Sequence, residues 1–177
     1  MKRDDFAPAA LVCLDLQRGR QSTAADSGAV VAVCRRVLAE ARRRGWPVLH
    51  VHSREGGPEE RRSIAGLEPR PDEPVFARIG PSAFSNRSFA ETAGSLGGPL
   101  VLAGFDLRDT VLATAYAAAD RALQVDVLRD AVSCGGHRDL ADLLLAPVQA
   151  LAPRARALNS NDLLNEGAPQ MAAANVP

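Results

Sequence analysis

Asp15 is the first residue whose type and position suggest chemistry, because it closes the apolar run 9–14, with Gln17 two positions later. A carboxylate at the end of such a run must be paired or face a cleft, since burying it alone is costly. Ligands of open α/β sheets also bind beyond the carboxyl ends of the strands. We therefore interpret Asp15 as a candidate acid or base, with a structural pair to an arginine or a helix cap as the alternative.

Thr110 is a second candidate, because it follows the apolar run 100–104 and a sharp turn expected over 105–108. A helix is expected to begin near Asp109, and backbone N–H groups at a helix start favour negative charge. Such a turn could form an oxyanion site for acyl transfer. Thr110 also suits a helix cap or first-turn position, and an internal threonine is a poor nucleophile without a neighbouring base.

Histidine and cysteine give weaker signals. His50 and His52 lie at i and i+2 of an expected strand and share one face, which could begin a metal site, but no third ligand follows at a suitable spacing. Cys13, Cys34 and Cys134 form no zinc pattern and are interpreted as small buried hydrophobes. The glycine motifs of nucleotide sites and the GxSxG motif of serine hydrolases are absent from the sequence. We therefore predict no metal and no cofactor.

The overall charge excludes further classes of function. Lys+Arg and Asp+Glu both total 21, so the net charge is zero and no basic field is available for nucleic acid. No apolar run reaches the roughly 20 residues of a membrane span, and Met1–Asp5 lacks the apolar core of a secretory signal. We expect a cytoplasmic protein that binds neither nucleic acid nor membranes. Lys2 is the only lysine, so no lysine is available for acid–base chemistry in the folded body.

Alternating strands and helices must position these residues. Apolar runs such as 100–104 are typical of strands buried on both faces, and the stripe of apolar residues after Ser27 has the period of a helix. Strands are expected at 9–14, 48–52, 75–77, 100–104, 124–128 and 155–158, and helices at 27–44, 88–96, 109–122, 137–149 and after Ser160. This alternation predicts an α/β fold with three layers, α/β/α, around a six-stranded, mostly parallel, Rossmann-like sheet.

The chain shows no internal repeat and no linker, so we predict one domain over 1–177, which is an ordinary domain size. Its core is expected to span about 8–165, and the tail 166–177 is expected to be loose or to dock on a partner. The segment 53–74, rich in Gly, Pro, Glu and Arg, is predicted to be a long surface loop with a short helix at 60–65. Long loops of this kind often act as lids over a site.

Five pieces of sequence occur in a characteristic order: Leu14–Gln17, Pro81–Phe84, Val101–Ala115, Asp130–Ser133 and Asn161–Leu164. Together they resemble the isochorismatase-like hydrolases, a superfamily that includes nicotinamidases, carbamoyl-amide hydrolases and isochorismatase. The resemblance covers about residues 8 to 165. It implies a six-stranded parallel sheet flanked by helices and assembly as a homodimer or homotetramer. It also implies a non-proline cis peptide after Gly104, between Phe105 and Asp106.

The amidase members of this superfamily use an Asp, a Lys and a nucleophilic Cys. Carried over by position, the Asp is Asp15, the Lys position holds Arg78, and the Cys position holds Thr110. These replacements disfavour a cysteine amidase mechanism, because thiolates attack near neutral pH and an unassisted threonine hydroxyl does not. The isochorismatase branch also lacks the Cys and uses the strand-end Asp as an acid on a vinyl ether, but it keeps the Lys.

The protonation of Asp15 decides which role it could have. Burial favours the protonated acid, whereas a close Arg78 guanidinium favours the ionised carboxylate. A close pair would suit a base or a structural partner, while an Arg78 turned toward a substrate anion would let Asp15 act as a general acid. Arg78 itself preserves the positive charge but cannot exchange protons. The sequence leaves both arrangements open.

Three functions are consistent with these residues. The first is a hydrolase that cleaves a vinyl ether or related bond of a small anionic metabolite, in specialised metabolism, with Asp15 as acid or base. The second is a catalytically reduced member that binds a ligand or a protein, and the third is an amide hydrolase using Thr110 or a water activated by Asp15. Besides Asp15, Arg78 and Thr110, the residues expected to contact substrate are Gln17, Ser82, Phe84, Phe105, Asp106 and Arg108, with Arg20 and Arg54 as further anion contacts.

Overall fold

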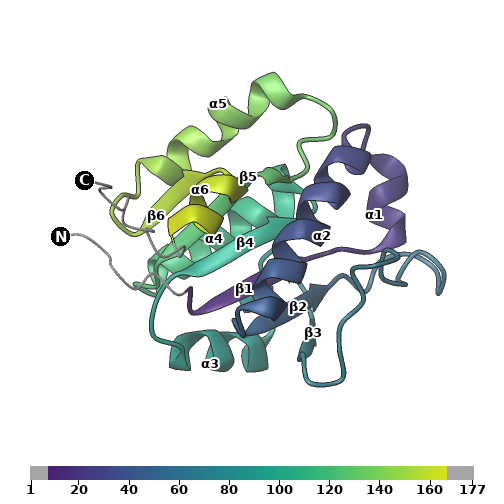
Figure 1. Cartoon of the computed structure of the whole chain (residues 1–177), viewed down its shortest axis with the longest axis horizontal. Coiled ribbons are helices and arrows are strands. Elements are labelled where there is room, and N and C mark those ends of the chain that lie inside the picture. Colours follow the sequence, from purple (N-terminus) through teal and green to yellow (C-terminus); the bar gives the residue numbers. More distant parts are fainter. Residues whose placement is uncertain (1–7, 167–177) are drawn as a thin grey trace, which may run out of the picture.

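A parallel six-stranded sheet forms the centre of the molecule in a computed structural model that describes residues 8–166 (Figure 1). The strand order is β3-β2-β1-β4-β5-β6, and every neighbouring pair is parallel. The strands are β1 (Ala10–Leu14), β2 (Val48–His52), β3 (Val75–Ala77), β4 (Leu100–Gly104), β5 (Val125–Val132) and β6 (Ala155–Leu158). The helices are α1 (Arg18–Thr23), α2 (Ser27–Arg43), α3 (Arg87–Ser95), α4 (Leu112–Asp120), α5 (Arg138–Gln149) and α6 (Ser160–Glu166).

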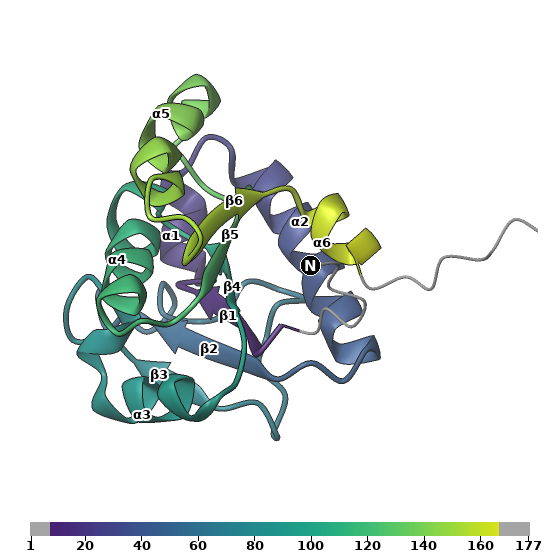
Figure 2. The ribbon, with the colours of Figure 1, turned by 90° about the vertical axis from the view of Figure 1, so that its left-hand side faces the viewer.

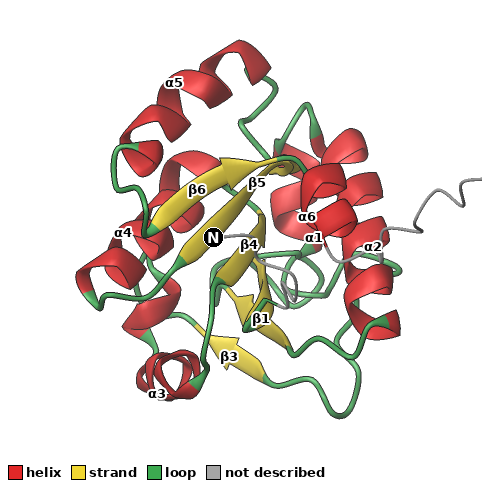
Figure 3. Cartoon of the chain, turned by 60° about the vertical axis from the view of Figure 1, so that its left-hand side comes forward, coloured by secondary structure: helices red, strands yellow, loops and turns green. Residues whose placement is uncertain are grey.

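Helices cover both faces of the sheet, which confirms the predicted three-layer fold (Figures 2 and 3). Helices α2 and α6 pack on one face, and α3, α4 and α5 pack on the other. Strand β1 is apolar at every position because both of its faces are buried. Leu11 and Cys13 pack on the side of α2 and α6, while Val12 and Leu14 pack on the side of α3, α4 and α5. A strand that buries both faces cannot alternate with polar residues.

The strand order reverses at β1, because β2 lies on one side of it and β4 on the other. The carboxyl ends of β1 and β4 therefore meet at the topological switch point, where ligands of such sheets bind. Gly104 makes this close approach possible: its φ is 132°, and a Cβ there would lie 1.9 Å from the carbonyl oxygen of Leu14. The next peptide, Phe105–Asp106, is the predicted non-proline cis bond.

Three local predictions need correction. The segment 60–65 forms turns and a single bridge, Gln17 to Ser63, and not a helix. Helix α1 was not predicted, because none of its residues is buried and it has no apolar stripe. The helix expected at 109–122 instead begins with a wide π turn, Leu107–Val111, that leads into α4.

Some predictions concern residues that the structure does not describe. The N-terminal residues Met1–Asp5 and most of the tail expected at 166–177 lie outside the described range. Within residues 8–166, no helix has both the length and the apolar composition that crossing a membrane requires. The organisation as one domain stays a prediction.

Candidate active site

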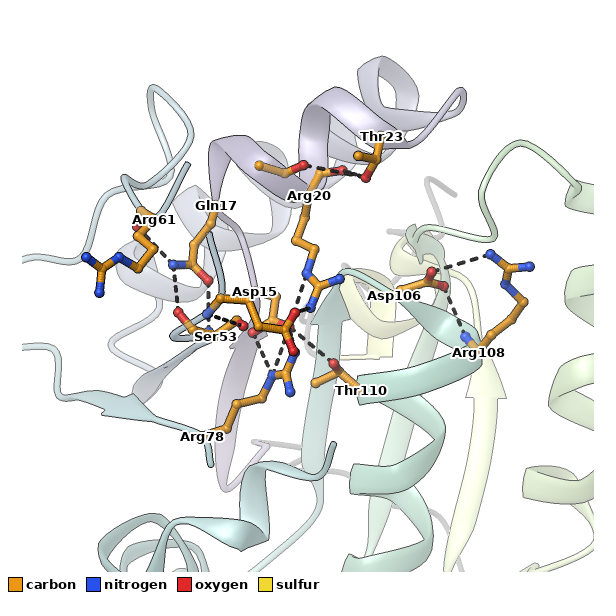
Figure 4. Close-up of polar contacts among 12 residues, drawn as sticks. Asp15, Gln17, Arg20, Thr23, Ser53, Arg61, Arg78, Asp106, Arg108 and Thr110 are labelled. Atoms are coloured by element: carbon orange, nitrogen blue, oxygen red, sulfur yellow. Dashed lines mark hydrogen bonds and ion pairs between the residues drawn. The ribbon is translucent and has the colours of Figure 1, made fainter. Parts of the chain in front are cut away.

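Asp15 lies at the carboxyl end of β1 and is completely buried (Figure 4). Its backbone has a φ of 48°, in the left-handed region that aspartate tolerates better than most residues. Its amide N–H donates to the carbonyl oxygen of Val51, 2.8 Å away on β2. The chain therefore turns at the end of the strand and holds the Asp15 side chain over the switch point.

Three side chains converge on the Asp15 carboxylate. The Nε–H of Arg78 donates to both oxygens, at 3.2 Å from Oδ1 and 3.0 Å from Oδ2, and its Nη2 lies 2.9 Å from Oδ2. The Thr110 hydroxyl donates to Oδ2 at 3.1 Å. From the opposite side to Arg78, Arg20 places its Nε 3.8 Å from the same oxygen. The structure thus brings Asp15, Arg78 and Thr110 together, and both Asp15 oxygens accept hydrogen bonds there.

Arg78 directly follows β3, and its guanidinium is committed to the protein. Its Nη1 donates to the carbonyl oxygen of Gly80 at 2.9 Å, in addition to the contacts with Asp15. Ser85 fixes this segment, because its hydroxyl accepts from the amides of Ile79 and Gly80, at 3.1 and 2.9 Å. Burial alone would lower the pKa of Arg78, but the hydrogen bonds and charge of Asp15 raise it above its ordinary value. Arg78 is therefore a fixed cation.

Thr110 reaches Asp15 because the π turn at Leu107–Val111 directs it inward, where it is 1% exposed. One turn later, Thr114 accepts a hydrogen bond from the amide of Ala83 at 3.0 Å, which ties α4 to the 81–84 segment. The π turn is closed by a hydrogen bond from the amide of Val111 to the carbonyl oxygen of Asp106, at 3.1 Å. π turns of this kind are frequent at functional sites.

Three amides of the turn that was expected to supply oxyanion donors already have partners. The amide of Leu107 donates to Ser133, and that of Arg108 donates to the Asp106 carboxylate at 3.1 Å. The amide of Asp109 donates to the carbonyl oxygen of Asp106. These N–H groups are already used. Asp106 and Arg108 also face each other as an ion pair of 3.6 Å, away from Asp15.

Three other residues expected to contact substrate have structural positions instead. Phe84 packs edge-to-face on Phe89, with ring centroids 5.1 Å apart, and Phe105 is 1% exposed in the layer formed by α2. Both rings, which we expected to contact substrate, pack in the hydrophobic core. The hydroxyl of Ser82 accepts from the amide of Phe84, at 3.1 Å, and caps a short helical turn.

Gln17 also serves the fold. Its Nε2 donates to the carbonyl oxygens of Ser53 and Arg61, at 3.1 and 2.9 Å, and its Oε1 accepts from the amide of Ser53 at 2.8 Å. Both N–H groups of the side-chain amide are thereby used, and its oxygen accepts one hydrogen bond. Gln17 clamps the long loop 53–74 against the start of α1.

Two cavities lie beside these residues. The larger has a volume of about 520 Å³ and includes Arg54, Arg78, Ile79 and Asp109 in its lining. The smaller, of about 170 Å³, includes Gln17 and Arg20. Ser53 and Glu55 belong to both linings. Arg78 is the member of the Asp15, Arg78 and Thr110 group that lines the larger cavity.

His50, Cys13 and Cys34 are placed apart from this site, whereas His52 borders it: its carbonyl oxygen accepts from the amide of Arg78 at 3.0 Å. Burial lowers the pKa of His52, and the nearby charge of Asp15 opposes that shift. His50 is buried, its Nε2 lies 2.9 Å from Oε2 of Glu73, and burial lowers its pKa despite that carboxylate. Burial raises the pKa of Cys34 to about 12 and raises that of Cys13 as well. Both thiols therefore stay protonated and unreactive. In the part of the chain that the structure describes, no three His, Cys, Asp or Glu residues are grouped to hold a metal ion.

Comparisons with known proteins agree on one family. A family model described as the isochorismatase domain matches residues 9–154. The structure resembles an isochorismatase from Pseudomonas putida, with a TM-score of 0.76 and 25% identity over 89% of this chain and 93% of that one. It also resembles a cysteine hydrolase from Pseudomonas syringae, with a TM-score of 0.77 and 13% identity over 91% and 93% of the two chains.

A third similar structure is the MAR1 ribonuclease from Caenorhabditis elegans, with a TM-score of 0.78 and 22% identity over 92% of this chain and 83% of that one. At 22% and 13% identity, the ribonuclease and the cysteine hydrolase show a shared fold alone. No curated protein matches the chain in sequence.

Proposed function

This chain belongs to the isochorismatase family of hydrolases, and from that premise we propose that it hydrolyses a small metabolite without a cysteine nucleophile. The larger cavity of about 520 Å³ is in the size range of small-molecule sites. Asp15, Arg78 and Thr110 stand together beside it. We propose these three as the residues that carry the reaction, in the cytoplasm and on a substrate with an anionic group.

The observation that carries this proposal is the hydrogen bond from the Thr110 hydroxyl to Oδ2 of Asp15, at 3.1 Å. A hydroxyl that donates to a carboxylate oxygen has the arrangement of a nucleophile with its base. Oγ1 would attack the carbonyl carbon of an amide or ester while its proton moves to Asp15. The leaving amine or alcohol would take that proton, and a water activated by the same carboxylate would release the acid from Thr110.

The geometry favours this base role over the acid role that vinyl ether cleavage requires. Arg78 and Thr110 together supply three hydrogen bonds to the Asp15 carboxyl group, so both of its oxygens already act as acceptors. A general acid must instead hold a proton near the working pH. Arg78 cannot supply that proton, because a guanidinium stays protonated.

The test is product formation from a panel of small amides, small esters and isochorismate, followed by mass spectrometry. We expect product from an amide or ester, loss of product in Asp15→Asn and Thr110→Ala, and partial activity in Thr110→Ser. If product persists in Thr110→Ala but is lost in Asp15→Asn, the nucleophile is a water molecule and not the threonine. Product from isochorismate alone would overturn the base role.

A second candidate function, ligand binding without turnover, is favoured by a specific observation. Asp15 and Thr110 are 0% and 1% exposed, so neither reacting group is open to solvent. If the site stays closed in solution, the protein would bind a ligand beside Arg78 and leave it intact. The same panel distinguishes this candidate, because it predicts raised melting temperatures with no product.

A further inference from the structure

Arg78 is already paired and buried, although its position made it the expected anion-binding residue; its Nη2 faces Oδ2 of Asp15 at 2.9 Å but makes no hydrogen bond within the described residues. Its Nε–H bonds both Asp15 oxygens, and its Nη1 bonds the carbonyl oxygen of Gly80. Its side chain is 6% exposed, and its charge is neutralised by a carboxylate 2.9 Å away. A ligand carboxylate would have to break a buried ion pair to gain this guanidinium, which is strongly unfavourable.

Arg20 differs from Arg78 in each of these respects. It extends from α1 toward Asp15, its side chain is 30% exposed, and it lines the smaller cavity (Figure 4). The Nε of Arg20 lies 3.8 Å from Oδ2 of Asp15, which is too long for a hydrogen bond. Asp15 therefore attracts the guanidinium without using any of its N–H groups. Its one hydrogen bond to a side chain within residues 8–166 is from Nη2 to Oε2 of Glu55, at 2.6 Å.

Glu55 is a replaceable partner for Arg20. Its side chain is 70% exposed and comes from the long loop 53–74, and it lines both cavities. A single bond between exposed charges contributes little to stability. A free carboxylate could instead bond the guanidinium with both oxygens, which is the stronger arrangement. Departure of Glu55 would also remove a side chain that the two cavities share.

We propose that Arg20 is the residue that binds the carboxylate of a ligand, and that Glu55 occupies this position until the ligand displaces it. This inference rests on the proposed function, since it names the substrate feature recognised at the same site. The substrate class is then a small carboxylate whose other end extends past Glu55 toward Arg78 and Thr110. Arg20 is a specificity residue, and Glu55 is an internal competitor.

The test is a titration of the purified chain with sodium benzoate, at constant ionic strength, followed by the NMR signals of the arginine Nε–H groups. We expect Glu55→Gln to lower the dissociation constant about fivefold, because the binding-competent fraction of the protein rises when the competitor is removed. Arg20→Gln is expected to abolish binding. The residues of α1 are not buried, so this variant is expected to fold, and its melting temperature verifies that.

A matched pair of controls comes from the same helix and the same loop. Arg18 and Glu59 form an exposed ion pair of 3.6 Å, and neither lines the two cavities. Arg18→Gln and Glu59→Gln are therefore expected to leave the benzoate affinity unchanged. The inference is overturned if Arg20→Gln binds benzoate like the parent, if Glu55→Gln binds no more tightly, or if Glu55→Gln shows no saturable shift. Because the readout is binding, any of these results leaves the test of hydrolysis through Asp15 and Thr110 independent.

Discussion

At the scale of single residues, the most constrained feature is the Asp15 carboxylate. It has no solvent exposure, and the two cations near it come from segments on opposite sides of the site. A buried charge is tolerated only when partners compensate for its lost hydration. Arg78 supplies most of that compensation through direct contacts at 2.9 to 3.2 Å. The arginine is therefore as important for folding as for any chemistry.

We expect Arg78→Ala to lower the free energy of unfolding by about 3 kcal/mol or more, because it leaves a buried carboxylate without its partner. Urea unfolding measures this change. Arg78→Ala in an Asp15→Asn background is expected to lose much less, since the charge needing compensation is gone. Equal losses in the two backgrounds would show that Arg78 stabilises the fold through contacts other than Asp15.

The candidate site residues could be proposed from sequence because they follow strands. Asp15, Arg78 and the turn before Thr110 come directly after β1, β3 and β4, and parallel strands end at the same edge of a sheet. The roles of neighbouring side chains could not be located in this way. Gln17 and Phe84 lie within recognisable motifs, but their tasks depend on which polar group or ring the tertiary fold places against them.

At the scale of elements, the loop 53–74 is held by the residues around α1. Gln17 contributes three hydrogen bonds, the amide of Gly19 donates to Glu60 at 2.9 Å, and the amide of Ile64 donates to Leu16 at 3.0 Å. Sequence predicted a loop here but placed a helix within it and missed α1. A helix without a buried face has no apolar periodicity to reveal it.

We expect Gln17→Ala to loosen this loop without unfolding the sheet. The substitution leaves the buried amide of Ser53 and two carbonyl oxygens without partners, which costs about 1 to 3 kcal/mol. Hydrogen exchange should then become faster for the amides of Ser53 and Ile64, while β4 and β5 stay protected. Gln149→Ala, at an exposed position of α5, is the control. Unchanged exchange at Ser53 would contradict a clamping role for Gln17.

At the scale of the whole molecule, a second buried polar cluster joins the sheet, the loop and α2. Glu73, near the end of the loop, accepts from Arg42 at 2.7 and 2.8 Å and lies 2.9 Å from His50. Burial alone would raise the pKa of Glu73, but hydrogen bonds from Arg42, the amide of Arg70 and His50 lower it to about 2. Burial lowers the pKa of His50.

Both shifts predict that the protein loses stability on acidification. A histidine with a lowered pKa stabilises the fold above its ordinary pKa of about 6.5, and this contribution fades as pH falls below that value. Glu73 adds a further loss as pH falls from its ordinary range toward 2. Between about pH 7.5 and 5.5, which spans the ordinary histidine pKa, His50→Gln should therefore lose less unfolding free energy than the parent. Exposed His137→Gln is the control, and an equal loss in His50→Gln would refute the assignment.

The architecture of the whole chain was the part most accessible from sequence. Apolar runs and helical stripes predicted the alternating order, whereas the neighbouring positions of β1 and β4 come from the structure. Assembly as a homodimer or homotetramer stays a prediction, which light scattering on the purified chain would check. Assembly depends on the shape of the protein surface, and the spacing of apolar residues along the chain does not reveal that shape.

The contacts of Asp15 also determine when the site can form during folding. Its partners Arg78 and Thr110 are 63 and 95 positions away in the chain. Closing loops of that length carries an entropic penalty, so we expect the three residues to meet once their strands have docked. A chain whose sheet has not assembled is therefore expected to lack the site. Occupancy of the site by a ligand would accordingly report on, and stabilise, the entire native sheet.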